Sequence, residues 1–170
     1  SKRMRSITVR HLLTMTSGIS FNEVSEAVET NWLKGIFASS VTCEPGTQFI
    51  YNSMNSYLLA ALVCRTSGSG TLMEFLKPRL FEPMGFGPAA WEKSPEGIEK
   101  GGWGMYLRVE DMAKLGLLVL QNGHWNCEEE ERQLLPKSWV QESVSSQVKS
   151  DKGEEYGFQI WVDSEAGCYT

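Results

Sequence analysis

The chain has few residues of the kinds that build metal or redox sites. Its four cysteines, Cys43, Cys64, Cys127 and Cys168, lie far apart, and none forms a Cys-x-x-Cys pair. Zinc sites and redox dithiols depend on such close spacing, so we expect no metal and no cofactor. Cysteines this sparse also do not require disulfide bonds, which favours a reducing compartment.

Long apolar runs and an excess of positive charge are missing as well. No run of about 18 apolar residues occurs, and no apolar segment follows the basic residues 1–5, so we expect neither a membrane span nor a signal peptide. The formal net charge is −5, and the largest charge run, residues 128–131, is acidic. We read that run as a solvated loop. Nucleic acid and anionic membrane surfaces are therefore excluded as expected partners.

What the chain does have is enough apolar sequence for one packed domain. Apolar residues make up 41% of 170, and the length fits a single domain. Alternating aromatic and β-branched residues predict a strand over 156–162. Apolar spacing near 3.6 residues predicts one helix or two short ones over 22–37, and further helices over 9–15, 55–67, 71–80, 109–122 and 137–145.

Local signals refine these elements. Thr8 is placed to cap the first predicted helix, and Pro78 predicts a bend or an end in the helix over 71–80. Glu110 and Lys114 lie one turn apart and predict an ion pair. His11 has no second histidine at metal-ligand spacing, so we interpret it as a core or hinge residue.

Residues 45–59, centred on Tyr51-Asn52-Ser53, resemble the second active-site motif of the serine β-lactamase and penicillin-binding-protein superfamily. Four more segments are similar to phrases of that superfamily and occur in its order: residues 8–18, 102–120, 134–140 and 156–161. The likeness is nearest to the esterase branch and to the amide-hydrolysing branch that resembles 6-aminohexanoate-dimer hydrolase. Arg108-Val109 departs from the usual Thr-Pro, which removes an expected helix cap.

The resemblance implies a mainly α fold, the helical lobe of the α/β β-lactamase/transpeptidase-like fold, with a short C-terminal β-strand segment. We expect residues 1–170 to be a single partial domain, with a helical lobe over 1–150 and the start of the sheet over 151–170. An α/β layer would cover part of such a lobe, so we expect an exposed apolar face and self-association of the chain into a homo-oligomer.

In this superfamily the tyrosine of the second motif is an acid/base beside a nucleophilic serine, which makes Tyr51 the catalytic candidate. The serine needs a lysine one helical turn later and an oxyanion hole. Ser146-Gln147-Val148-Lys149 has the spacing, but it follows Tyr51 and lies among polar residues, so we interpret it as a coincidence. No Lys-Thr-Gly, Lys-Ser-Gly or His-x-Gly triplet occurs.

Ser53, Trp91 and Trp103 are the candidate substrate-binding residues. Ser53 stands where an amide is frequent, which weakens assignment as a penicillinase. Each of these assignments has an alternative. Tyr51 could be a half-buried structural tyrosine that ends a turn, and the motif could instead be read in the register Ser53-x-Asn55. Both tryptophans could simply pack in the core.

We therefore expect a fragment of a serine hydrolase that cleaves a small-molecule ester or amide through an acyl-serine and is inactive alone. The alternatives are a non-catalytic homologue and an unrelated helical binding module. A bacterial cytoplasmic location is favoured over a periplasmic or secreted one.

Overall fold

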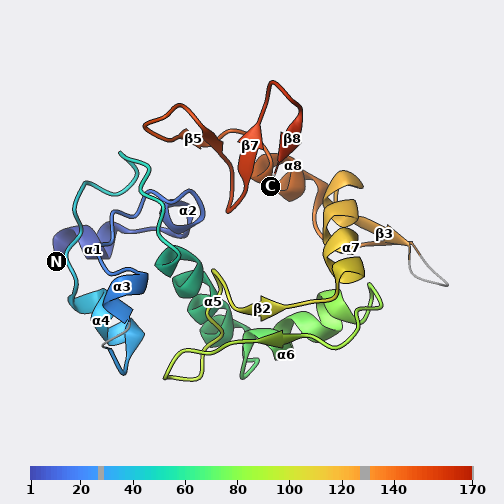
Figure 1. Cartoon of the computed structure of the whole chain (residues 1–170), viewed down its shortest axis with the longest axis horizontal. Coiled ribbons are helices and arrows are strands. Elements are labelled where there is room, and N and C mark those ends of the chain that lie inside the picture. Colours follow the sequence, from blue (N-terminus) through green and yellow to red (C-terminus); the bar gives the residue numbers. More distant parts are fainter. Residues whose placement is uncertain (27–28, 127–130, 170) are drawn as a thin grey trace.

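The computed structural model describes residues 1–26, 29–126 and 131–169, and its first part is a set of short helices (Figure 1). The cap predicted at Thr8 is present: the Thr8 hydroxyl accepts from the His11 backbone N–H at 3.3 Å, and His11 Nδ1 accepts in return from the Thr8 N–H at 3.2 Å, which completes a capping box. His11 thus serves the helix start. The helices of this part are α1 (Lys2–Ser6), α2 (Val9–Leu13), α3 (Glu23–Glu26) and α4 (Trp32–Ala38).

The region predicted as one helix or two over 22–37 forms two. Asn31 begins the second, because its side-chain oxygen accepts from the Lys34 N–H at 2.7 Å. Residues 27–28, inside the predicted range, lie outside the described part of the chain, as do residues 128–130 of the acidic run and Cys127.

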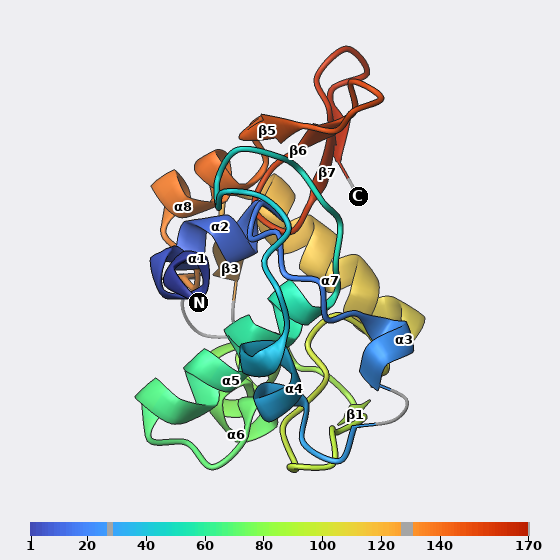
Figure 2. The same cartoon turned by 90° about the vertical axis from the view of Figure 1, so that its left-hand side faces the viewer.

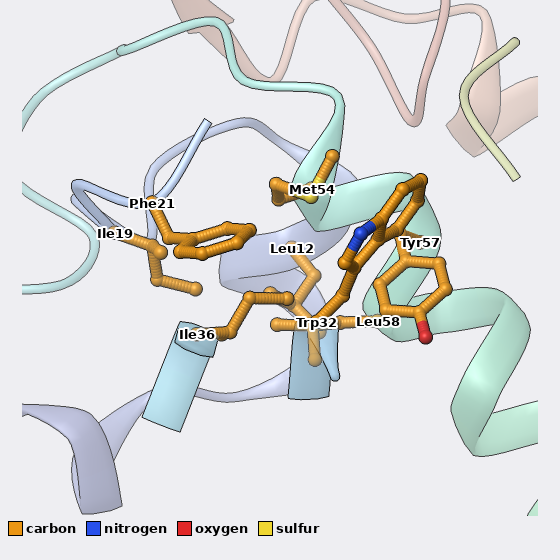
Figure 3. Close-up of a cluster of buried hydrophobic side chains, with 8 residues drawn as sticks. All are labelled: Leu12, Ile19, Phe21, Trp32, Ile36, Met54, Tyr57 and Leu58. Carbon is orange, nitrogen blue, oxygen red and sulfur yellow. The ribbon is translucent and has the colours of Figure 1, made fainter. Parts of the chain in front are cut away.

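The core lies where the first helices meet α5 (Met54–Ser67), as Figure 3 shows. Trp32 packs edge-on against Tyr57 with ring centroids 5.2 Å apart. Each large apolar side chain buried this way stabilises the fold by about 1.5–3 kcal/mol. The cluster consists of Leu12, Ile19, Phe21, Trp32, Ile36, Met54, Tyr57 and Leu58.

The helix after α5 changes its winding at proline, as predicted. The α-helix α6 (Leu72–Leu76) gives way to a π-helical turn, η1 (Lys77–Phe81), which contains Pro78. Pro78 has no N–H for the α-helical bond pattern, so the change of winding occurs where that donor is missing.

Helix α7 (Val109–Leu120) begins at Arg108 without a side-chain cap, as the missing Thr-Pro implied. The predicted Glu110–Lys114 pair is wrong. Lys114 instead lies 3.2 Å from the buried carboxylate of Asp111, which also accepts from Arg108 at 2.9 and 3.0 Å and from the Gly87 N–H at 3.0 Å. A buried carboxylate competes better for the ammonium than an exposed one.

The predicted strand over 156–162 is wrong as a single element. The chain forms β6 (Glu155–Tyr156), turns, and returns as β7 (Trp161–Asp163), which pairs antiparallel with β6. The alternating pattern crossed the turn because Phe158 and Ile160 are also apolar. This sheet has the order β5-β6-β7-β8, with β5 at Val148–Lys149 and β8 at Cys168–Tyr169.

Two further antiparallel pairs were not predicted. They are β1 (Ala90–Trp91) with β2 (Met105–Tyr106) and β3 (His124–Asn126) with β4 (Glu131–Gln133), and the last helix is α8 (Lys137–Ser143). The structure is 39% helical and 14% strand, so helices dominate, but small antiparallel sheets are spread along the chain. None of the described helices is long and apolar enough to cross a membrane.

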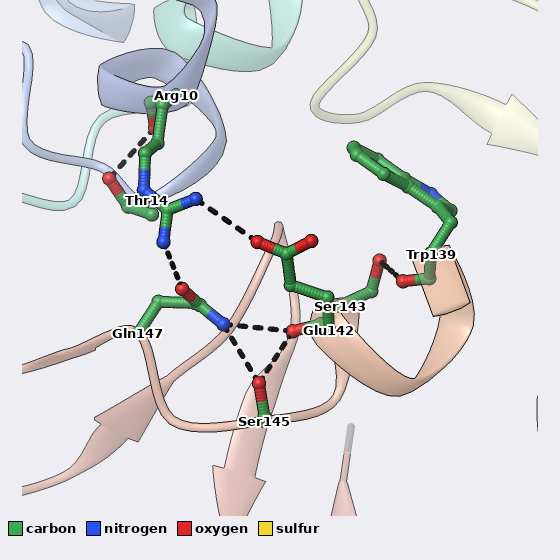
Figure 4. Close-up of polar contacts among 7 residues, drawn as sticks. All are labelled: Arg10, Thr14, Trp139, Glu142, Ser143, Ser145 and Gln147. Atoms are coloured by element: carbon green, nitrogen blue, oxygen red, sulfur yellow. Dashed lines mark hydrogen bonds and ion pairs between the residues drawn. The ribbon is translucent and has the colours of Figure 1, made fainter.

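The C-terminal sheet and α8 return to the first helices, seen best in Figure 2. Arg10 of α2 lies 3.1 Å from Glu142 of α8 and also bonds to Gln147 (Figure 4). Both members of the Arg10–Glu142 pair are about half exposed, so the pair contributes at most about 1 kcal/mol. These contacts nevertheless show that α2 lies against the end of α8 and the segment that follows it.

Candidate active site

Tyr51 lies in the loop that leads into α5, and its ring is held while remaining accessible. The residue is 53% exposed. Its ring stacks on Trp161 of β7 at 6.0 Å between centroids and 14° between planes, and it meets Tyr156 edge-on at 6.4 Å. Within the described residues, no hydrogen bond to the Tyr51 hydroxyl occurs. The phenol is therefore free to bond to a group from outside.

A second tyrosine beside it has the opposite environment. Tyr156 is 2% exposed and lies 4.8 Å from Trp161 and 5.2 Å from Phe49, centroid to centroid. Burial, and to a lesser degree the charge of Tyr51, raises the pKa of Tyr156 far above its usual value. Tyr156 therefore stays neutral and forms a wall beside Tyr51, which is the exposed phenol of the two.

Buried amides fix the backbone that follows Tyr51. The Asn52 side-chain amide donates to the carbonyls of Ile19 and Phe21 at 3.0 and 2.8 Å, and its oxygen accepts from the Met54 N–H at 2.9 Å. Asn55 donates to the Asn52 carbonyl at 2.9 Å. These bonds tie the start of α5 to the loop after α2, so the position of Tyr51 is set by buried polar contacts.

Ser53 lies beneath a glycine and is only 9% exposed. A Cβ on Gly102 would approach the Ser53 Cβ to 2.9 Å, so the absence of a side chain at 102 is what allows this contact. Ser53 begins α5 without a side-chain hydrogen bond to its N-terminus. A substrate role for Ser53 stays a prediction.

Trp91 and Trp103 pair with each other, and Trp103 also packs on the core. The Trp91 indole N–H donates to the Trp103 carbonyl at 2.9 Å, and the Trp103 ring stacks on Trp32 at 5.8 Å. Lys100 Nζ lies 5.4 Å from the Trp103 ring. Both tryptophans are half-buried. Neither tryptophan is among the rings that contact Tyr51, which are Tyr156 and Trp161 of the C-terminal hairpin.

The Ser146–Lys149 pair has a geometry unlike a nucleophile and its lysine. Lys149 lies on strand β5, its side chain is 64% exposed, and its Nζ is 3.2 Å from Glu155. A lysine activates a serine by lying one helical turn away in a desolvated site, and an exposed, ion-paired lysine on a strand meets neither condition.

Two hollows lie near these elements. A cavity of about 460 Å³ is lined by residues of the C-terminal sheet, among them Trp161, Glu155 and Tyr169. An apolar one of about 160 Å³ lies between α7, α8 and the β6–β7 turn. Trp161 therefore both contacts Tyr51 and borders the larger cavity. Sequence reasoning missed Trp161 as a neighbour of Tyr51, although Trp161 belongs to a segment already matched to the superfamily.

A sequence profile of the β-lactamase family matches residues 1–169 of the chain. The chain belongs to the β-lactamase family. A comparison with curated protein sequences found no match to this chain.

Solved structures show how much of a known fold this β-lactamase-family chain covers. A penicillin-binding protein from Bacillus halodurans is 22% identical, with a TM-score of 0.71, over 91% of this chain and 56% of its own. A structure described as a 6-aminohexanoate-dimer hydrolase from Bacillus anthracis is 20% identical, with a TM-score of 0.74, over 95% of this chain and 49% of its own. The chain thus adopts part of the β-lactamase-like fold and spans about half the length of these structures.

Proposed function

We propose that this chain is the helical lobe of a serine hydrolase that cleaves a small-molecule ester or amide through an acyl-serine intermediate. Tyr51 acts as the acid/base of that reaction. The observation that carries the proposal is the setting of Tyr51: its ring is held by Trp161 and Tyr156, while half of the side chain is exposed at the start of α5.

Tyr51 needs help from outside these residues to act as a base. A nearby ammonium group would stabilise the phenolate and so allow the Tyr51 hydroxyl to take up and return a proton. The proposed source is a lysine one turn after the nucleophilic serine, both supplied by the remainder of the enzyme. Ser53, Trp91 and Trp103 would border the substrate, and no cofactor takes part.

The support for an amide or ester substrate is the likeness to the structure described as a 6-aminohexanoate-dimer hydrolase. This is consistent with Ser53 standing where an amide is frequent in penicillin-recognising members. The substrate class proposed is therefore a linear amide or ester.

A role in assembly is favoured by the exposed apolar face of α7. This face comprises four side chains that are 44–78% exposed: Val109, Met112, Leu117 and Leu120. Contiguous apolar surface of this kind marks interaction sites. A penicillin-binding protein homologue from Pyrococcus abyssi, 20% identical with a TM-score of 0.67 over 91% of this chain and 43% of its own, is described as octameric, which is consistent with self-association of this chain.

The proposal is tested by assaying the purified chain with a chromogenic cephalosporin and a nitrophenyl ester, beside a Tyr51→Phe variant. We expect no turnover by either protein, because no serine and lysine of the described residues have the required geometry. Turnover that disappears in the Tyr51→Phe variant would place the nucleophile within these 170 residues. It would contradict the proposal that the nucleophilic serine and its lysine come from the remainder of the enzyme.

A further inference from the structure

The turn between β6 and β7 contains a residue in an uncommon conformation. Gln159 has a φ of +62°, in the left-handed region that residues with a side chain rarely adopt. Holding such a residue there costs free energy, so the surrounding contacts must over-determine it. The contacts made by Gln159 show what holds it.

Gln159 binds two other elements with both ends of its amide. Its backbone N–H donates to the Leu13 carbonyl at 3.0 Å, and Nε2 donates to the carbonyls of Leu12 and Leu13 at 3.0 and 3.3 Å. The hydroxyl of Ser56, in the first turn of α5, donates to Oε1. The last carbonyls of a helix lack partners within it, so Gln159 satisfies the end of α2 while it binds α5.

The rest of the turn is fixed to α8. The Phe158 N–H donates to the Ser143 carbonyl at 2.9 Å. A Cβ on Gly157 would lie 2.0 Å from the same carbonyl oxygen, so only glycine fits at that position. The turn is therefore attached to α2, α5 and α8 together.

The two strands that leave this turn carry the aromatic rings that hold Tyr51. Tyr156 ends β6 and Trp161 begins β7, and both contact the Tyr51 ring. Tyr51 leads into α5, the same helix start that Gln159 reaches through Ser56. Gln159 therefore fixes the hairpin and the loop of Tyr51 to one common point.

We infer that Gln159 is a positioning residue for the candidate catalytic tyrosine: by clamping the β6–β7 turn to α2 and α5, it holds Trp161 against the Tyr51 ring. The catalytic meaning of this clamp rests on the proposed function of Tyr51. The clamp itself does not, and it can be measured without any reaction.

Substitutions at 159 separate the clamp from the backbone conformation. Gln159→Gly keeps the positive φ without strain and keeps the backbone bond to Leu13, but it loses the side-chain amide. Gln159→Ala also loses the amide and keeps the strain. Gln159→Glu keeps the acceptor for Ser56 and sets a carboxylate against two carbonyl oxygens, so it should resemble Gln159→Ala.

Gln147 provides a matched control on the neighbouring segment (Figure 4). Its side-chain amide also makes three bonds: it accepts from Arg10 and donates to the Glu142 carbonyl and the Ser145 hydroxyl at 3.0 and 2.8 Å. Those bonds join α2 to the end of α8, and none of them is made to Gln159, although Arg10 also lies 5.2 Å from the Phe158 ring of the turn. Gln147→Ala therefore loses a comparable set of side-chain bonds and leaves every bond of Gln159 in place.

The experiment is fluorine NMR of the chain labelled with fluorotryptophan, with the Trp161 resonance assigned by Trp161→Phe among the six tryptophans. We expect Gln159→Gly and Gln159→Ala to move or broaden the Trp161 resonance, and Gln147→Ala to leave it in place. Removing the side-chain amide and relieving the strain act in opposite directions, so the Tm of Gln159→Gly should stay within about 3 °C of the parent. Ser56→Ala, which removes one arm, should move the resonance in the same direction by less.

An unchanged Trp161 resonance in a folded Gln159→Gly protein would overturn the clamp. If that variant does not fold, an unchanged resonance in Ser56→Ala would overturn it. In the complete enzyme, Gln159→Gly should lower kcat by roughly ten- to a hundredfold, the range expected when a catalytic group is slightly misplaced, with KM little changed. A moved resonance with unaltered kcat would keep the clamp and reject its role in positioning Tyr51 for the reaction, whereas the acid/base role of Tyr51 is tested separately by Tyr51→Phe.

Discussion

Replacing Tyr51 separates its ring from its hydroxyl. Because no described residue hydrogen-bonds to the hydroxyl and the side chain is 53% exposed, Tyr51→Phe should change the free energy of unfolding by less than about 0.5 kcal/mol. A structural tyrosine would behave differently, since the loss of a buried hydrogen bond costs about 1–3 kcal/mol. The phenylalanine variant thus tests the alternative of a tyrosine that merely ends a turn.

Tyr51→Ala removes the ring as well, and its cost follows from the area buried. A fully buried aromatic side chain covers about 150–250 Å², so a half-buried one covers about 100 Å². At about 25 cal/mol per Å² this area is worth roughly 2 kcal/mol after allowance for the alanine methyl, and the stacked pair with Trp161 adds about 0.5–1 kcal/mol. The expected total is about 2–3 kcal/mol.

Urea and thermal unfolding followed by circular dichroism would measure both variants. The alanine variant should lower Tm by roughly 5–10 °C, while the phenylalanine variant should stay within about 2 °C of the parent. A phenylalanine variant destabilised by more than about 1 kcal/mol would refute the free hydroxyl, and an alanine variant without cost would refute the stack on Trp161.

Three further outcomes follow from other parts of the molecule. The neighbouring guanidinium of Arg108 lowers the pKa of Asp111. The contribution of Asp111 to stability is therefore complete above the unfolded pKa of about 4 and is lost as the pH falls through the folded pKa. The difference in Tm between the parent and Asp111→Asn should narrow on acidification, and a constant difference would refute the Arg108–Asp111 pairing. In urea unfolding, Gly157→Ala should destabilise the fold by about 2–3 kcal/mol, because the new methyl meets the Ser143 carbonyl oxygen. Gly116→Ala, at a helical site where the new methyl has no atom within 4 Å, should stabilise the fold by about 0.5–1 kcal/mol. Equal effects of the two substitutions would contradict the close contact at Gly157. Light scattering should show self-association of the chain at about tens of micromolar, and Leu120→Lys should reduce that association. A monomeric parent would show that the apolar face of α7 is not an interface between copies of this chain.

Helices with strong local signals could be predicted from the sequence. Thr8 lies where a hydroxyl cap is required, and α2 begins directly after it; α5 ends at Ser67 as predicted, and Gly68 after it has the left-handed φ typical of a helix end. These signals act within one turn of the chain, so the sequence alone reveals them. The predicted positions of α2, α5 and α7 are accordingly close to those observed.

Features that depend on distant partners could not be predicted. The turn at 157–160 has apolar residues at alternating positions, so the period of two continued through it, and only the bonds from Gln159 to α2 and α5 reveal the reversal. The same holds for Tyr51. Its motif indicated a role, but its contact with Trp161 joins residues 110 positions apart, a pairing that no local pattern encodes.

The central claim is that Tyr51 carries acid/base chemistry for a nucleophile supplied by the remainder of the enzyme. The most direct measurement is steady-state hydrolysis of nitrophenyl esters and a linear amide by the complete protein, with and without Tyr51→Phe. We predict that kcat falls by about 100- to 10,000-fold, the usual contribution of general acid–base catalysis, while Tm is unchanged. Full activity in a folded Tyr51→Phe enzyme would contradict the claim.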